Sequence, residues 1–168
     1  YKGKEKISGG RVGDETSIPL SKKLYDLKLP MGRLKTGTPA RIKLSSIDLS
    51  SMQEQPGDQT PPPMSLLHPP TTTLPQISCY ITRTNKITHN IISNNTHLSA
   101  MYSGQISGIG PRYCPSIEDK INKFAEKDSH QIFIEPEGLD KDLVYPNGIS
   151  TSLPEDIQEQ FVKSIVGL

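Results

Sequence analysis

The sequence is poor in large aromatic side chains, with no Trp and only three Phe among its 168 residues. Hydrophobic residues of all kinds make up 33% of the chain, so any core is modest in size. Fifteen Pro and thirteen Gly interrupt regular structure often, which favours loops and short elements. These shortages exclude a long helical bundle and leave room for one domain with a small core.

Long apolar runs and a disulfide framework are also missing. No run reaches the roughly 18 apolar residues needed to cross a bilayer, and the visible N-terminus carries no cleavable signal, so we expect a soluble protein with no membrane partner. Cys79 and Cys114 are too few for a secreted disulfide scaffold, which favours reduced thiols in a cytosol-like compartment. Because Tyr1 stands where an initiator Met is expected and the chain stops soon after a helical pattern, we expect an internal segment of a longer protein.

The common nucleotide and metal motifs do not occur either. The patterns GxGxxG, GxxxxGK[ST], HExxH and CxxC are all absent, so the usual phosphate loop is not encoded in this sequence and no metal site is predicted. Four histidines lack the spacing of metal ligands, and we expect each to be solvated or hydrogen-bonded rather than catalytic. They are His68, His89, His97 and His130.

Charge is distributed unevenly along the chain. Residues 1–43 hold eleven Lys or Arg against four Asp or Glu, a net charge of +7, whereas residues 44–168 hold eight against fourteen, a net charge of −6. A basic segment of this kind suits contact with a nucleic-acid backbone. A charge run is more often a solvated face, so charge alone leaves both interpretations open.

Hydrophobic periodicity, capping residues and turn residues predict short helices and strands in three parts of the chain, residues 1–41, 42–110 and 111–168. The expected helices are Ile18–Leu27, Asn85–Ile92, Ile117–Lys127 and Glu155–Val166, with Ser17, Asn85, Ser116 and Ser152 as capping residues. The expected strands or extended pieces are Met31–Lys35, Ile77–Thr82, Gly104–Ile109 and Gln131–Glu135. A Pro-rich stretch, Gln55–Pro75, is expected to be an irregular loop, and residues around Pro146 to Gly148 to form a turn.

The most informative cluster is Gly110–Lys120, with the sequence GPRYCPSIEDK. Cys114 lies just before the helix expected to follow Ser116 and two residues from Arg112, so the helix dipole and the guanidinium both favour a thiolate over a thiol. A reactive cysteine and a half-buried structural cysteine in a Pro-bounded turn are equally compatible with this pattern. The same helix start also suits a nucleotide phosphate bound on free backbone amides.

Five motifs, in this order along the chain, resemble the glucose-inhibited division protein A family. They are Ser8–Arg11 with Ser17–Ser21, Gly32–Pro39, Gly110–Lys120, His130–Leu139 and Val144–Gln158. Five ordered motifs that together cover essentially the whole chain are far more specific than any single glycine pattern. By this resemblance the chain is identified as part of a flavoprotein of tRNA uridine 5-carboxymethylaminomethyl modification.

The resemblance implies an enzyme with several cofactors and partners. Members of the family bind FAD, reduce it with NADH, and use methylene-tetrahydrofolate as the carbon donor together with glycine or ammonium. They modify the wobble uridine of certain tRNAs with a GTPase partner, as a homodimer that forms a heterotetramer. The implied location is the cytoplasm, or the mitochondrion for a eukaryotic nuclear gene.

The implied fold is α/β with an α+β mix, part of a Rossmann-type FAD-binding domain interrupted by a small α+β insertion domain. Residues 1–41 are expected to belong to the FAD-binding domain, residues 42–110 to the insertion, and residues 111–168 to the return into the FAD-binding domain. The dinucleotide fingerprint is then expected upstream of this segment, and a helical domain that binds tRNA and the partner is expected downstream.

The resemblance also assigns roles to individual positions. Ser17 matches a position that contacts FAD, and Cys114, supported by Arg112, matches a cysteine implicated in methylene transfer. Its thiolate would add to the uracil ring, or it would act as an acid or base near the flavin. The implied nicotinamide-dinucleotide segment is Gly110, Pro111, Arg112, Tyr113, Cys114, Pro115, Ser116, Ile117, Glu118, Asp119, Lys120, Ile121, Asn122, Lys123 and Phe124. The weaker expected tRNA contacts are Lys22, Lys23, Lys28, Lys35 and Arg41.

The sequence departs from the family pattern at a few places in or near the expected insertion. Ala40 stands where a second Pro is common, Arg83 stands where His is common, and Leu66–Pro75 lacks the usual aromatic residues. Cys79 matches no family cysteine and is expected to be a structural strand residue. These departures bear on contacts of the insertion with NADH or RNA. The alternatives are another FAD-linked oxidoreductase domain or a non-catalytic binding fragment, and the segment alone is expected to be inactive.

Overall fold

The computed structural model describes residues 1–9, 13–67 and 74–168. The helices are α1 (Ile18–Asp26), α2 (Lys86–Asn95), α3 (Ile117–Lys123) and α4 (Glu155–Lys163), with 3₁₀ turns at Leu44–Ser46, Leu49–Ser51 and Thr96–Leu98. The strands are β1 (Gln53–Gln55), β2 (Cys79–Arg83), β3 (Gln131–Pro136) and β4 (Val144–Asn147). This mixture of helices and sheet confirms the predicted α/β class with an α+β character.

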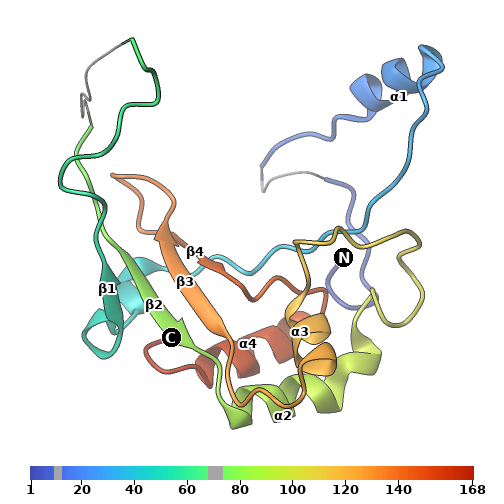
Figure 1. The fold of residues 1–168 in the computed structure, drawn as a ribbon. Helices are drawn as coiled ribbons and strands as arrows, with labels where there is room; N and C mark the ends of the chain where they lie inside the picture. Colours follow the sequence, from blue (N-terminus) through green and yellow to red (C-terminus); the bar gives the residue numbers. More distant parts are fainter. Residues whose placement is uncertain (10–12, 68–73) are drawn as a thin grey trace.

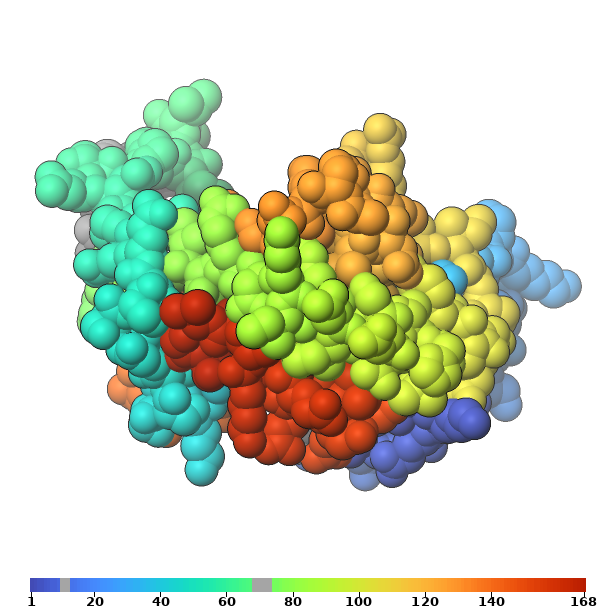
Figure 2. Space-filling view, turned by 90° about the horizontal axis from the view of Figure 1, so that it is seen from below, coloured from blue at the N-terminus to red at the C-terminus, as the bar shows by residue number. Residues whose placement is uncertain are grey.

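A four-stranded sheet organises the molecule, with strand order β1-β2-β3-β4 and antiparallel pairing throughout. Ile132 and Ile134 of β3 are fully buried, whereas Phe133 between them is half-buried, as the period of two in a strand requires. Helices α2, α3 and α4 gather on one side of the sheet (Figure 1). Figure 2 looks at the molecule from that side and shows α2 and α4 packed side by side.

The core between the sheet and these helices is built mainly of isoleucine. Its buried members are Ile92, Ile117, Ile121, Ile132, Ile134, Val144, Ile149, Leu153, Ile157, Phe161 and Ile165. Burying one such side chain contributes about 1.5–3 kcal/mol relative to leaving it exposed. Phe161 is the largest of them, in keeping with the scarcity of aromatic residues in the sequence.

Two predicted helix caps are confirmed. The Asn85 side chain accepts a hydrogen bond from the Thr88 amide at 3.0 Å, and the Thr88 hydroxyl accepts one from the Asn85 amide, which completes a capping box at α2. The Ser116 hydroxyl accepts the Asp119 amide at 3.1 Å at the start of α3. These bonds satisfy amides that have no partner inside the helix.

Several predicted elements are wrong or end early. Met31–Lys35 is not a strand, because Leu34 forms only an isolated bridge with Ile109 and no neighbouring strand continues the ladder. Gly104–Ile109 likewise forms no strand and contributes only Ile109 to this bridge. Helices α3 and α4 end at Lys123 and Lys163, short of the predicted Lys127 and Val166.

The predicted cap of α4 is also wrong, and one strand lies where a turn was expected. The Ser152 hydroxyl lies 2.8 Å from that of Ser99 instead of capping α4, which begins after Pro154. Strand β4 contains Pro146, which pairs opposite Ile134. Because β4 is at the edge of the sheet, the missing Pro amide need not break the ladder.

The N-terminal region extends from this core. No residue of α1 is buried, and Figure 1 shows α1 projecting away from the sheet.

The sheet takes β1 and β2 from residues 42–110 and β3 and β4 from residues 111–168, so it joins those two parts. The division into FAD-binding and insertion domains stays a prediction. Within the described parts of the chain, no helix is both long and apolar enough to span a membrane.

Candidate functional site

Residues 108–110, which lead into the turn that carries Cys114, lie against residues 33–35 through backbone contacts. The Lys35 amide donates to the Ile109 carbonyl at 3.1 Å. Gly108 has a φ of +129°, and a Cβ there would lie 3.2 Å from the Arg33 carbonyl oxygen, so glycine permits this close approach. The aliphatic part of the Lys35 side chain runs beside Gly110. Two of the predicted motifs, Gly32–Pro39 and Gly110–Lys120, therefore meet in space.

Cys114 lies exposed on this turn as a free thiol. Its amide donates to the Pro111 carbonyl at 3.4 Å, which closes the turn. Arg112 and Tyr113 are also exposed, with the Arg112 guanidinium carbon 5.2 Å from the centre of the Tyr113 ring. The sulfur is thus accessible to a ligand, which excludes the half-buried environment of a structural cysteine.

The start of α3 differs from the expected phosphate site. The Ile117 amide donates to the Ser150 carbonyl at 2.8 Å, and the Asp119 amide donates to the Ser116 hydroxyl, so two amides expected to be free are already used. The first turn also carries two carboxylates, Glu118 and Asp119. A helix of seven residues with this first turn offers little attraction to an anion. Contact of Gly110–Phe124 with a dinucleotide stays a prediction.

Glu118 anchors α3 to the segment that follows β4. Its side chain is fully buried, and its Oε1 accepts hydrogen bonds from the Thr151 hydroxyl at 2.9 Å and the Ser152 amide at 3.3 Å. Its Oε2 is buried and has no hydrogen-bond partner among the described residues. The Thr151 amide donates in turn to the Thr38 carbonyl, so this carboxylate helps to join three segments of the chain.

Lys120 of α3 also contacts the segment that follows β4. Its ammonium donates to the Gly148 carbonyl at 2.8 Å, and its side chain is half-buried. Burial lowers the pKa of Lys120, and the negative charge of a Cys114 thiolate acts in the opposite direction and raises it. Lys120 therefore fastens α3 to the turn that follows β4.

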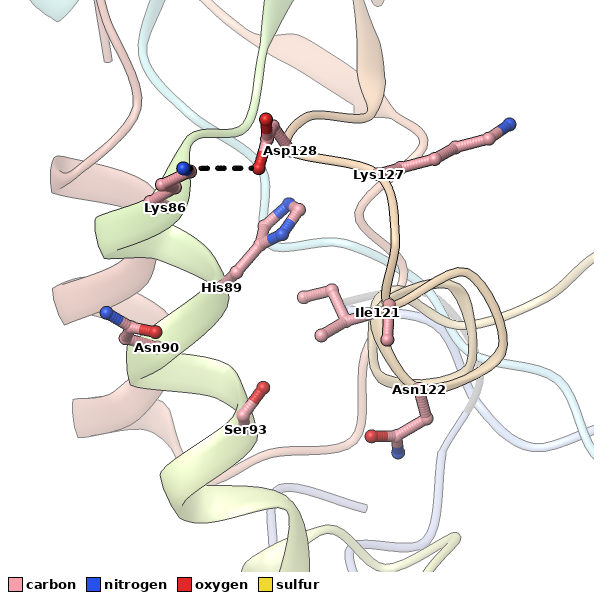
Figure 3. A pocket seen from close by; sticks show the side chains of 9 residues that line it. Lys86, His89, Asn90, Ser93, Ile121, Asn122, Lys127 and Asp128 are labelled. Atoms are coloured by element: carbon pink, nitrogen blue, oxygen red, sulfur yellow. Dashed lines mark ion pairs between the residues drawn. The ribbon is translucent and has the colours of Figure 1, made fainter.

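A concave region lies between α2 and α3, and Figure 3 shows its lining. His89 points into the space between the two helices, and an ion pair of 3.4 Å joins Lys86 to Asp128 at its edge. The lining residues are Lys86, His89, Asn90, Ser93, Ile121, Asn122, Ala125, Lys127 and Asp128. None of the residues expected to be catalytic contributes to it.

Two histidines stack beside this region, with their ring centroids 5.3 Å apart. The His89 ring nitrogen lies 2.8 Å from the Thr84 hydroxyl, and the same hydroxyl accepts the His130 amide at 2.7 Å. The prediction of a hydrogen-bonded histidine is thus confirmed for His89. It is wrong for the His130 side chain, whose Nε2 is buried and has no hydrogen-bond partner among the described residues. Burial lowers the pKa of both imidazoles, and for His130 the charges of His89, Lys120 and Lys127 lower it further.

The other two histidines lie elsewhere. His97 is exposed, which confirms that it is solvated, and His68 lies outside the described residues. Cys79 is the first residue of β2 and is half-buried, as expected of a structural strand cysteine. Burial raises the pKa of its thiol.

The expected FAD contact and tRNA contacts are spread over the N-terminal region. Ser17 is exposed at the start of α1 and makes no capping hydrogen bond with its side chain. Lys22, Lys23 and Lys28 are exposed on or just after α1, the helix that projects away from the sheet in Figure 1. All four roles stay predictions.

The Arg41 side chain contacts several neighbouring groups. Its guanidinium pairs with Glu137 at 2.7 Å, donates to the Thr38 hydroxyl at 2.8 Å, and lies 4.4 Å from the centre of the Tyr145 ring. These contacts favour a role at the junction between the Gly-Thr-Pro turn and the sheet over contact with RNA.

The sequence did not indicate that two residues of α3 bind the segment that follows β4. Glu118 and Lys120 were assigned only as members of the dinucleotide segment, and nothing in their spacing indicates a bond to Thr151 or Gly148. These partners lie about 30 residues away along the chain. The one available signal was the pattern Asn-Gly at Asn147 and Gly148, which indicates a turn but not its contact.

The family model described as "Glucose inhibited division protein A" matches residues 1–168. Two solved structures of GidA from Aquifex aeolicus are similar over 100% of this chain. The form I crystal gives 48% identity and a TM-score of 0.80, and this chain covers 29% of that protein. The form II crystal gives 44% identity and a TM-score of 0.78, with 26% of that protein covered. The chain therefore spans less than a third of these relatives.

A match over every residue, together with close structural similarity at this level of identity, is decisive for classification. The five motifs predicted this family, and the prediction is confirmed. The chain belongs to the glucose inhibited division protein A family.

Proposed function

We propose that this chain is a segment of an FAD-dependent enzyme that adds a carboxymethylaminomethyl group to C5 of the wobble uridine of certain tRNAs. The exposed thiol of Cys114 carries this proposal, because it lies on a turn that a backbone hydrogen bond closes, within the motif Gly110–Lys120. The reaction uses NADH as reductant and methylene-tetrahydrofolate as carbon donor, and it involves a GTPase partner.

Cys114 is the residue of this chain that we assign to the chemistry. A thiolate that adds to the uracil ring makes the neighbouring ring carbon nucleophilic, and a thiol close to a flavin transfers a proton. Both roles require a sulfur that substrate can reach, and Cys114 meets this requirement. Cys79 does not, since it is half-buried at the start of β2.

Features of the chain fit two of the cofactors. The exposed Ser17 hydroxyl makes no capping bond and is able to bond to FAD. The exposed Arg112 guanidinium beside the Tyr113 ring offers a cation and an aromatic face, which together suit a nucleotide. When bound, FAD supplies the two-electron chemistry that side chains lack.

The test replaces one sulfur at a time in the full-length enzyme. Cys114→Ser should abolish the modified nucleoside, measured by mass spectrometry of tRNA from complemented cells, while the flavin absorbance of the purified protein is unchanged. Cys79→Ser is the matched control and should retain modification, because its thiol is half-buried at the start of β2. Modification that persists in Cys114→Ser would remove Cys114 from the chemistry.

A further inference from the structure

We propose that the concave region between α2 and α3 binds an unpaired nucleobase, which stacks on the ring of His89. His89 belongs to α2, so the inference reaches beyond the turn that carries Cys114. The lining of the region suits a base from any source, and the choice of tRNA as that source rests on the proposed function.

The concave region has a size and walls that suit a flat ring. Its volume is about 350 Å³, within the roughly 300–1,000 Å³ of small-molecule sites. His89 projects into it from α2 and Ile121 from α3, so an imidazole and an aliphatic side chain form parts of its walls (Figure 3). Walls of this kind offer apolar contact to the faces of an aromatic ligand.

The His89 ring is the accessible end of a stack of two imidazoles. Its centroid lies 5.3 Å from that of His130, and the ring planes are inclined by 26°. His130 is buried, whereas His89 is half-buried and lines the concave region. A further ring is therefore able to join the stack at His89, and histidine is among the side chains on which proteins stack unpaired bases.

Contacts within the protein hold the His89 ring in place before a base arrives. Its Nε2 lies 2.8 Å from the Thr84 hydroxyl, and that hydroxyl also accepts the His130 amide at 2.7 Å. Burial lowers the pKa of both imidazoles, so both rings are neutral near pH 7. A ring that is already fixed loses little conformational freedom when a ligand stacks on it.

The two ends of the concave region offer hydrogen-bonding groups. Lys86 and Asp128 form an ion pair of 3.4 Å at one end, and Ser93 and Asn122 lie at the other (Figure 3). Every nucleobase has a donor beside an acceptor on its Watson–Crick edge, and an ammonium beside a carboxylate complements such an edge. These groups suit the edge of a base without selecting one base over another.

The charges at the rim disfavour a bare phosphate as the ligand. Lys86 is already paired with Asp128. Lys127 extends away from the concave region in Figure 3, and its ammonium lies 5.1 Å from the centre of the Phe124 ring. The negative charge of Asp128 repels a phosphate placed beside it. A neutral, planar ligand rich in hydrogen-bonding groups is the better match.

The test compares two substitutions of His89 in the full-length protein. His89→Leu and His89→Phe both lose the contact with Thr84, but only Phe keeps an aromatic ring. Loss of stacking on one base lowers affinity by about 5- to 150-fold, so His89→Leu should weaken tRNA binding by an amount in this range in a filter-binding assay. His89→Phe should retain most of the affinity.

Two controls separate stacking from other causes. A stacked base neutralises no phosphate, so the salt dependence of tRNA affinity should keep its slope in His89→Leu. His97→Leu alters an exposed ring and should leave the affinity unchanged. Equal losses in His89→Leu and His89→Phe would assign the ring a structural role and overturn the proposal.

A second ligand identifies the source of the base. Equilibrium dialysis measures the binding of nucleoside 5′-monophosphates to the wild type and to both His89 variants. A dependence on the ring that is seen with tRNA assigns the base to RNA, and one that is seen only with a monophosphate assigns it to a free nucleotide. Binding of both ligands that is independent of the ring would overturn the proposal.

A measurement on the wild-type protein decides if the variants misfold. Diethylpyrocarbonate modifies histidine rings, and mass spectrometry of peptides distinguishes His89 from His97. Saturating tRNA should slow modification of His89 several-fold and leave that of His97 unchanged, whereas ribose 5-phosphate, which lacks a base, should protect neither. A rate at His89 that neither tRNA nor a monophosphate changes would contradict the proposal.

These outcomes are distinct from those for Cys114. A Cys114→Ser protein that still modifies tRNA would refute the proposed function and leave the stacking on His89 measurable. Binding that does not depend on the His89 ring would refute this inference and leave the role of Cys114 intact.

Discussion

Glu118 shows how one buried carboxylate positions the candidate site. Because the Thr151 hydroxyl and the Ser152 amide both donate to it, Glu118→Ala removes their acceptor and leaves a cavity at a fully buried position. We expect a local loss of about 2–4 kcal/mol. Glu118→Gln keeps an oxygen acceptor and should cost less, about 1 kcal/mol.

Hydrogen exchange of peptides that cover α3 and residues 148–153, in the full-length protein, measures both changes as local opening free energies. Lys123→Gln, at an exposed position of the same helix, serves as control and should change protection little. Equal protection in Glu118→Ala and the wild type would show that Glu118 is not an anchor.

At the scale of single residues, the sequence predicted contacts between residues close in the chain and missed contacts between residues far apart in it. It placed Cys114 on a turn before a capped helix, and the Ser116 cap and the exposed thiol agree with that. It assigned thiol activation to Arg112 and to the dipole of the following helix, both of which are near in the chain. The contact of Lys120 with Gly148 depends on where the turn after β4 lies relative to α3, and no local pattern encodes such a contact.

Among the elements, those with a strong local signal were predictable. Helix α2 begins where Asn85 caps it, and β3 shows alternating burial. Strand β1 has only three residues, all exposed, and exists because it pairs with β2. Conversely, the predicted strand Met31–Lys35 has suitable residues but no partner strand, so it forms a single bridge. Strand formation depends on a neighbour that the local sequence does not reveal.

The junction between α2 and β3 should be sensitive to pH. Burial lowers the pKa of His89 and His130 below the ordinary 6.5, so near that pH the unfolded segment binds more protons than the folded one. The stabilisation is complete above about pH 6.5 and is lost as the pH falls through the lowered folded values. Protection of residues 84–90 and 128–132 from hydrogen exchange, corrected for intrinsic rates, should therefore decrease from pH 7 to pH 5.5.

Two histidine variants test the origin of this effect. His89→Gln keeps a polar group near Thr84 and does not titrate, so it should flatten the pH dependence. His97→Gln alters an exposed ring and should leave the dependence as it is in the wild type. Protection that is constant over this pH range would contradict the assignment to the histidine pair.

For the molecule as a whole, the distribution of charge in the sequence corresponds to a distribution in space. The basic N-terminal region includes α1, which carries Lys22 and Lys23 and stands away from the core (Figure 1). Because no residue of α1 is buried, packing within this chain does not account for its exposed Ile18, Leu20 and Leu27. Composition predicted the basic segment and the small core, but it carried no information about where the segment would lie.

The last prediction concerns this basic arm as a tRNA contact. Neutralising a phosphate releases counterions, so each lost contact makes the dependence of affinity on salt shallower by about 0.7 to 0.9 in the log–log slope. Lys22→Glu with Lys23→Glu in the full-length protein should weaken tRNA binding and reduce the slope by about 1.4 to 1.8. The control, Lys141→Glu with Lys163→Glu, changes the same net charge at exposed positions outside the arm. A slope and an affinity that match the wild type in the arm variant, or an equal loss in both variants, would place the RNA contact elsewhere on the protein.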